Sequence, residues 1–137
     1  MSPRRVFIDT GAWYAVQVMD DVHHKKAAAS MAALVRDGVE LFTTELVVGE
    51  TYTLLRTRRG REPALRFVET ARASARLEVV PLGEIDLAGT YELLQKYADQ
   101  DFSFVDATSF VTMRARRLRH AFAFDQHFRT AGFVTIG

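Results

Sequence analysis

Short apolar runs alternate along the chain with longer stretches in which apolar residues recur at helical spacing. The short runs, at residues 5–9, 39–43, 77–81, 121–125 and 133–136, predict strands. The longer stretches, at residues 11–19, 23–36, 45–59, 63–74, 86–98 and 104–119, predict helices, with a further short turn of helix after Asp125. This alternation is typical of an α/β domain with a mainly parallel sheet. No repeat, low-complexity tract or linker divides the chain, so the sequence predicts a single domain over residues 1–137.

Two of the strand-like runs end in a carboxylate. The run VFI leads directly into Asp9, and the run AFAF leads into Asp125. An uncompensated charge in apolar surroundings is costly, but open parallel sheets bind ligands just outside the carboxyl ends of their strands. Each acid taken alone also has a simpler interpretation, as the N-cap of the helix that follows.

Glu50 and Asp106 fall within helical stretches. In TELVVGETYTLLR, Glu50 lies at helical spacing from Leu46 and Leu54, so it is predicted to interrupt an apolar stripe. The alternative is that Glu50 stands at the margin of the stripe and reaches solvent or pairs with an arginine. In DFSFVDATSF, Asp106 shares a face with Phe102, and together with Ser103 it also fits the S-x-x-D form of a capping box. A capped helix start can present a carboxylate to a site, so these two interpretations of Asp106 are compatible.

Together the four acids suggest one cation site at one end of the sheet. Clustered carboxylates raise one another's pKa unless a cation neutralises them, and hard oxygen ligands favour Mg²⁺ or Mn²⁺. Such a site suits metal-assisted phosphoryl chemistry. Without these four acids, 17 − 4 = 13 acidic residues face 18 basic ones, as expected if a polyanion is held over an acidic pocket.

Arginine makes up most of the basic residues, because only 3 of the 18 are lysines. Its planar donor fork suits phosphate, although a genome rich in arginine codons explains the bias equally well. The run MRARRLRH predicts arginines on the late turns of a helix, where they either contact an RNA backbone or form a solvated helix end; LLRTRRGR follows the same pattern. The candidate RNA-binding residues are Arg114, Arg116, Arg117 and Arg119.

Histidines and aromatics carry weaker signals. No H-x-x-x-H spacing joins His23, His24 and His127, which are therefore expected to be surface residues. Trp13 and Tyr14 are expected to belong to the core or to an interface.

The order VFIDTGAW, TELVVGETYTLLR, DFSFVDATSF and AFAFDQHF closely resembles the PIN-domain ribonucleases, especially their VapC toxin members, over essentially the whole chain. The resemblance implies a three-layer α/β/α fold with a mainly parallel, roughly five-stranded sheet. It also implies an acidic quartet made of Asp9, Glu50, Asp106 and Asp125.

Asp9 and Asp106 match the family's usual Mg²⁺ ligands, Asp125 and Glu50 are further candidate ligands, and Thr10 matches a supporting hydroxyl. Gly11 stands where many relatives carry Ser or Asn, which puts a polar contact there in doubt. Asp99 and Asp101 are candidates for a fifth acid, with a solvated loop as the default.

The resemblance further implies a Mg²⁺-dependent endoribonuclease, with Mn²⁺ able to substitute, acting as the toxin of a toxin–antitoxin pair. The expected partners are an RNA substrate, a cognate antitoxin and a second copy of the chain, with a hetero-oligomer as a further possibility. The alternatives are a housekeeping PIN nuclease in RNA processing and a non-catalytic domain that binds RNA or protein.

Phosphotransfer domains fit the sequence poorly. A haloacid-dehalogenase-like phosphatase needs D-x-D, whereas Asp9 is followed by Thr10 and Gly11. A response-regulator receiver needs a lysine late in the chain, and the lysines are Lys25, Lys26 and Lys96.

The composition bears on the compartment. The start MSPRR leads into a strand without the apolar segment of a signal peptide, and the chain contains no cysteine and no apolar run long enough to span a membrane. We therefore expect a soluble, cytoplasmic protein.

Overall fold

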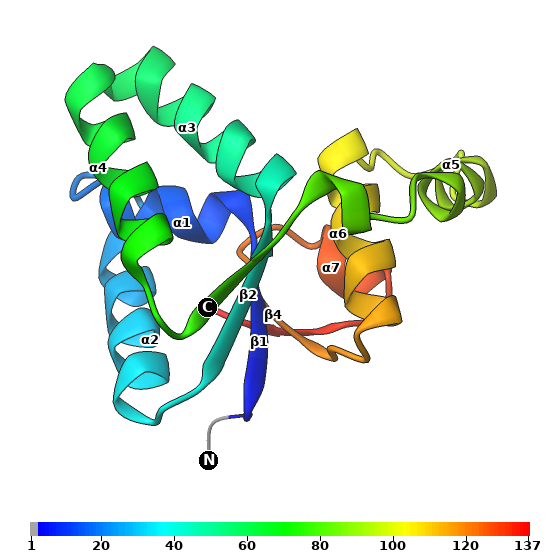
Figure 1. Ribbon diagram of the computed structural model, residues 1–137, viewed down its shortest axis with the longest axis horizontal. Helices are drawn as coiled ribbons and strands as arrows, with labels where there is room; N and C mark the ends of the chain where they lie inside the picture. Colours follow the sequence, from blue (N-terminus) through cyan, green and yellow to red (C-terminus); the bar gives the residue numbers. More distant parts are fainter. Residues whose placement is uncertain (1–2) are drawn as a thin grey trace.

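The computed structural model describes residues 3–137, which form a three-layer α/β/α domain. Its five strands run parallel in the order β3-β2-β1-β4-β5. The strands are β1 (Arg5–Ile8), β2 (Glu40–Thr44), β3 (Leu77–Val80), β4 (His120–Phe122) and β5 (Val134–Ile136). The helices are α1 (Thr10–Gln17), α2 (His24–Arg36), α3 (Glu45–Arg59), α4 (Arg61–Ala73), α5 (Leu87–Lys96), α6 (Phe104–Ala115) and α7 (His127–Thr130), with a 3₁₀ turn η1 (Leu82–Glu84). Helices α1 to α4 lie on one side of the sheet and α5 to α7 on the other, which confirms the expected fold class (Figure 1). Within residues 3–137, no helix combines the length and the apolarity needed to cross a membrane.

Most predicted boundaries agree with the structure to within a few residues, and α3 has the bounds expected from the sequence. The largest difference is at α6, which ends at Ala115 and not at residue 119. Arg117 adopts a left-handed backbone (φ 56°), and the Leu118 N–H donates to the Met113 carbonyl over 2.8 Å. This is the geometry that usually places glycine after a helix. Because an arginine occupies the left-handed position, the sequence gives no glycine signal for the end of α6.

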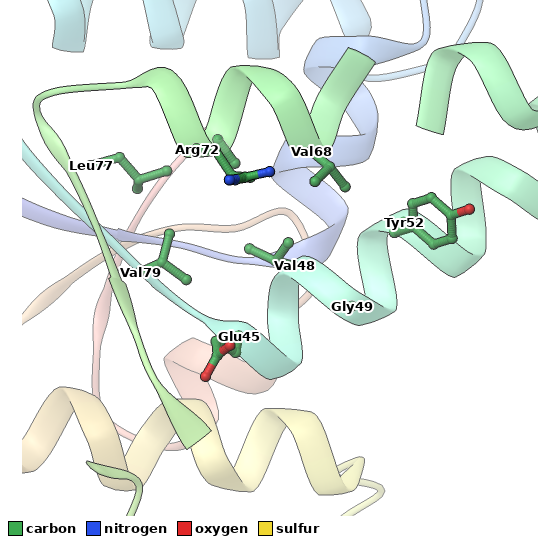
Figure 2. Close-up of a pocket in the computed structure, with 9 residues that line it drawn as sticks. Glu45, Val48, Gly49, Tyr52, Val68, Arg72, Leu77 and Val79 are labelled. Carbon is green, nitrogen blue, oxygen red and sulfur yellow. The ribbon is translucent and has the colours of Figure 1, made fainter. Parts of the chain in front are cut away.

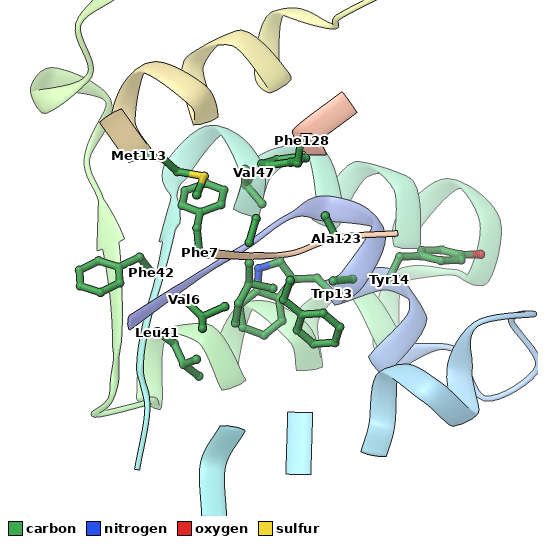
Figure 3. Close-up of a cluster of buried hydrophobic side chains, with 14 of the residues drawn as sticks. Val6, Phe7, Trp13, Tyr14, Leu41, Phe42, Val47, Met113, Ala123 and Phe128 are labelled. Atoms are coloured by element: carbon green, nitrogen blue, oxygen red, sulfur yellow. The ribbon is translucent and has the colours of Figure 1, made fainter. Parts of the chain in front are cut away.

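The central strand β1 is buried on both faces, which explains its uninterrupted apolar run. Val6, Phe7 and Ile8 are all 0% exposed. Around them, side chains from both helical layers fill the interior, as Figure 3 shows for a cluster that includes Trp13 and Phe128. Trp13 and Tyr14 are buried members of this core, as predicted.

The register of the sheet brings the ends of β1 and β4 together. Ile8 pairs with Phe122 in the parallel ladder, and the Asp9 N–H donates to the Phe122 carbonyl over 3.1 Å. Since parallel strands end at the same edge of a sheet, Asp9 and the segment that carries Asp125 lie at one edge.

Candidate metal site

Asp9 is the buried centre of an acidic cluster. Asp9 is only 3% exposed, and this burial raises the pKa of its carboxyl group from 3.8 to about 8. The charges of Asp125 and Asp106, and more weakly that of Glu50, act in the same direction. Asp9 occupies the N-cap position of α1, but its side chain makes no capping hydrogen bond. The capping interpretation therefore does not explain this carboxylate, and the nearby acids do interact with it.

Asp106 lies in the first turn of α6 and forms the predicted capping box with Ser103. The Ser103 hydroxyl accepts from the Asp106 N–H over 2.9 Å, and the Ser103 N–H donates to Asp106 Oδ2 over 3.0 Å. The same oxygen lies 3.0 Å from Nδ1 of His127. Asp106 thus caps its helix and faces the cluster, as both interpretations of the sequence proposed.

His127 was expected to be a surface residue, and the structure places it partly exposed beside the acids. Its side chain is 30% exposed, and its ring packs edge-on against Phe102, with the centroids 5.4 Å apart. The short helix α7 begins at His127, so the chain turns back over the site directly after Asp125. The spacing D-x-H shortly after a strand is the sequence pattern that indicates a histidine next to the acids, and the spacing H-x-x-x-H does not detect it.

Asp125 completes a compact group. Single ligand atoms from Asp106, Asp125 and His127 all lie within 4.8 Å of one another. Asp125 Oδ1 accepts from the His127 backbone N–H over 2.9 Å. Desolvation, followed by the charge of Asp106, raises the pKa of Asp125.

Glu50 does not occupy an apolar stripe, contrary to the sequence prediction. It is exposed, and the buried face of α3 is formed by Val47, Thr51 and Leu55. Thr51 can be buried because its hydroxyl donates to the Val47 carbonyl over 2.8 Å. The core face of α3 therefore includes a threonine, which the apolar pattern of the sequence does not reveal. Glu50 lies at the margin of the stripe, close enough for its charge to contribute to the raised pKa of Asp9.

A groove of about 730 Å³ runs along α3 beside Glu50. Leu46, Leu54 and Val105 line it, and Arg58 adds a positive charge. Of the four acids, Glu50 is the one that lines this groove.

The arginines at the end of α6 lie away from the acids. At about 1.5 Å per residue, the helix carries its C-terminal end well over 10 Å from Asp106. Arg114 donates to the Ala131 carbonyl over 3.1 Å, and Arg116 forms ion pairs with Glu78 and Glu84. Arg117 and Arg119 are exposed, and a contact between RNA and these arginines stays a prediction.

The other acids and the supporting residues are also placed. Asp99 and Asp101 are exposed in the loop before α6, as expected of a solvated segment. A Cβ on Gly11 would lie 4.0 Å from Asp9 Oδ2, an ordinary contact, so a serine could be accommodated there.

The donor atoms fit a hard divalent cation. The cluster offers carboxylate oxygens whose mutual repulsion a cation would relieve, and the chain has no cysteine thiolate to favour a softer metal. Among residues 3–137, Thr10 Oγ1 is the one buried side-chain polar atom without a hydrogen-bond partner. A buried hydroxyl left free beside Asp9 has capacity to bind an ion or its water.

Metal binding should release a proton near neutral pH, because Asp9 must ionise to bind a cation. Below the pKa of Asp9, the apparent affinity for Mn²⁺ is expected to rise by up to about tenfold per pH unit between pH 6 and pH 8. Calorimetric titrations in two buffers with different ionisation enthalpies measure both the affinity and the number of protons released. An affinity that does not change over this range would contradict the raised pKa.

A separate hollow of about 670 Å³ lies between α3, α4 and the edge strand β3. Figure 2 shows Val48, Val68 and Val79 around it, with Glu45 at one end and Arg72 at the other. Glu45 is engaged within the protein, since its Oε1 accepts from the Leu82 N–H over 2.7 Å. None of the four acids lines this hollow, so it is distinct from the acidic cluster.

Comparison with known proteins identifies relatives in sequence and in fold. The sequence model of the PIN domain family matches residues 6–134. The 23S rRNA-specific endonuclease VapC20 of Mycobacterium tuberculosis, from strains CDC 1551 and H37Rv, is 36% identical over 138 residues, which covers 96% of this chain and 97% of the relative. The crystal structure of Mycobacterium tuberculosis VapC20, described as a sarcin–ricin loop cleaving toxin, superposes with a TM-score of 0.83 at 34% identity, covering 94% of this chain and 96% of the other. FitAcB from Neisseria gonorrhoeae shares the fold, with a TM-score of 0.68 at 15% identity and 96% of each chain covered.

Proposed function

Since this chain belongs to the PIN-domain family, we propose that it is a divalent-metal-dependent endoribonuclease that hydrolyses RNA phosphodiester bonds. The observation that carries the proposal is the convergence of Asp9, Asp106 and Asp125 at one edge of the sheet, where burial and then the charges of Asp125 and Asp106 raise the pKa of Asp9. Repulsion between carboxylates destabilises a protein core, whereas in a cation site the bound ion neutralises it.

The proposed ligands of Mg²⁺, or of Mn²⁺ in its place, are Asp9 and Asp106. Asp125, in the compact group with Asp106, is a further ligand, and Thr10 supports the site through its free hydroxyl. When bound, the cation supplies charge that favours ionisation of the attacking water and offsets charge on the phosphate oxygens. Glu50, exposed beside the groove along α3, contributes its carboxylate where substrate and water enter.

The proposed substrate is a structured RNA. The relative VapC20 is named for its action on 23S rRNA, and at 36% identity over nearly the whole chain we propose the same class of substrate for this protein. The groove along α3, with the Arg58 guanidinium 5.5 Å from the centroid of the Tyr14 ring, is the proposed path of the RNA backbone.

We further propose that the protein is the toxin of a toxin–antitoxin pair. The similarity to a protein described as a toxin supports this role over housekeeping RNA processing. The partners that follow are an antitoxin, which must keep RNA from the acidic cluster, and a second copy of the chain.

RNA cleavage should depend on added metal. Purified protein is expected to cut a hairpin with the sarcin–ricin loop sequence in Mg²⁺ or Mn²⁺, and EDTA should lower the rate by about 10²-fold or more because the acids then repel the phosphate. The measurement is the initial cleavage rate on denaturing gels, with a hairpin of scrambled loop sequence as the control for specificity. Equal rates in EDTA would exclude the proposed chemistry, and metal binding without cleavage of any RNA would favour the non-catalytic alternative.

A further inference from the structure

Oδ2 of Asp106 is held from two sides. The Ser103 backbone N–H donates to it over 3.0 Å, and Nδ1 of His127 lies at the same distance. The Asp106 side chain is only 12% exposed, so these two nitrogens replace most of the water that a carboxylate oxygen would otherwise bind.

The imidazole ring of His127 is fixed in turn. It packs edge-on against Phe102, which itself packs against Phe110 with ring centroids 5.0 Å apart. The His127 backbone N–H donates to Asp125 Oδ1, which fixes the start of α7 independently of the ring. The ring therefore has a defined orientation, with Nδ1 directed at Asp106.

Hydrogen bonding at 3.0 Å to an ionised carboxylate requires the proton to be on Nδ1. In that tautomer Nδ1 has no lone pair to offer a cation, although its distance from Asp125 and Asp106 would otherwise suit a ligand. Donors that orient a ligating carboxylate are a common part of metal sites.

We propose that His127 is a positioning residue, whose Nδ1–H acts with the Ser103 N–H to fix Oδ2 of Asp106 and leave Oδ1 as the ligand atom for the cation. This inference rests on the proposed function of the acidic cluster, because it assigns Asp106 as a ligand. It distinguishes the two oxygens of Asp106, of which Oδ2 has two hydrogen-bonding partners in the protein and Oδ1 is assigned to the cation.

Three substitutions test this role. An asparagine places its amide nitrogen near the position of Nδ1, whereas a glutamine places its amide nearer Nε2 and an alanine has no donor. We therefore expect H127A and H127Q to bind Mn²⁺ about 10–100-fold more weakly than the wild type, and H127N to bind close to the wild-type value. Isothermal titration calorimetry at one fixed pH gives these affinities, and thermal melting of the metal-free proteins shows whether each variant is folded. H120N is the matched control, because His120 begins β4 at the opposite end of the sheet.

Two results would overturn the inference. Wild-type affinity in H127A would show that the ring does not position Asp106, and an H127N variant as weak as H127A would show that the Nδ1 donor is not the feature that matters. Long-range ¹H–¹⁵N spectra of the metal-free protein provide a test that needs no cation, with the His127 signals assigned by their loss in H127N. A proton on Nδ1 is expected, and a proton on Nε2 alone would contradict the proposal. If the wild type binds no Mn²⁺, the proposed function fails, while the tautomer still decides the hydrogen bond on which the inference depends.

Discussion

Replacing Asp9 by asparagine is expected to abolish RNA cleavage and, at the same time, to stabilise the metal-free fold. Asp9 is the most buried of the four acids and the one whose pKa is raised to about 8. An amide of nearly the same shape removes the charge of a proposed metal ligand, which should lower the cleavage rate by about 10³-fold or more. The same amide can donate to the neighbouring carboxylates, so it relieves the repulsion that the ionised Asp9 creates.

The pH dependence of unfolding gives this prediction a definite sign. Between the unfolded pKa of 3.8 and the folded value of about 8, Asp9 is protonated in the native state and ionised in the unfolded chain. The native state then binds more protons, so the free energy of unfolding of the metal-free wild type falls as the pH rises through this window. Asp125, whose pKa is also raised, adds to the same slope. D9N removes the contribution of Asp9. At about 1.4 kcal/mol for each pH unit between the two pKa values, its gain in the free energy of unfolding should amount to several kcal/mol at pH 8 and be nearly absent at pH 4.

Urea denaturation in EDTA at several pH values, together with cleavage assays in Mg²⁺, measures both effects on the same protein. D99N is the matched control, because Asp99 is exposed in the loop before α6 and outside the acidic cluster. It should leave the cleavage rate and the pH slope as they are in the wild type. A D9N protein that cleaves RNA normally, or that loses stability at pH 8, would refute the assignment of Asp9.

The strand-end acids could be predicted from sequence because local pattern and sheet topology agree there. A buried strand followed at once by a carboxylate is visible in VFID, and a parallel sheet brings such ends to one edge. Asp106 could also be predicted from the sequence, since the capping box fixes both the start of α6 and the direction of the side chain.

Other features depend on contacts that no local pattern encodes. Thr51 is buried because its hydroxyl bonds within the helix, and this moves the core face of α3 away from Glu50. The end of α6 depends on an arginine in a left-handed conformation, which sequence rules assign to glycine. The contact of His127 with Asp106 depends on a turn that folds it back onto a residue 21 positions earlier in the chain.

An aromatic cluster between α6, α7 and β5 holds these site residues in place. The ring of Phe110 meets that of Phe102 at 5.0 Å, that of Phe128 at 4.8 Å and that of Phe133 at 5.7 Å. Phe110 lies one helical turn after Asp106 in α6, and Phe128 follows His127 in α7. The packing of one ring therefore sets the distance between the two helices that carry Asp106 and His127.

Phe110→Ala is accordingly expected to be the most destabilising of the substitutions considered, and to weaken metal binding from a distance. Phe110 is 0% exposed, and its removal leaves a cavity among aromatic rings, at a cost of about 3–5 kcal/mol in the free energy of unfolding. Urea denaturation of the metal-free protein measures this loss, and Mn²⁺ calorimetry on the fraction that remains folded measures the effect on the site.

Phe104→Ala is the control on the same helix, because Phe104 is 43% exposed and its replacement should cost no more than about 1 kcal/mol in the free energy of unfolding. Phe110→Leu keeps most of the volume, and it is expected to stay folded and to show a smaller loss of both stability and affinity. If either variant is destabilised while its affinity for Mn²⁺ matches that of the wild type, the cluster supports the fold alone and does not set the distance between Asp106 and His127.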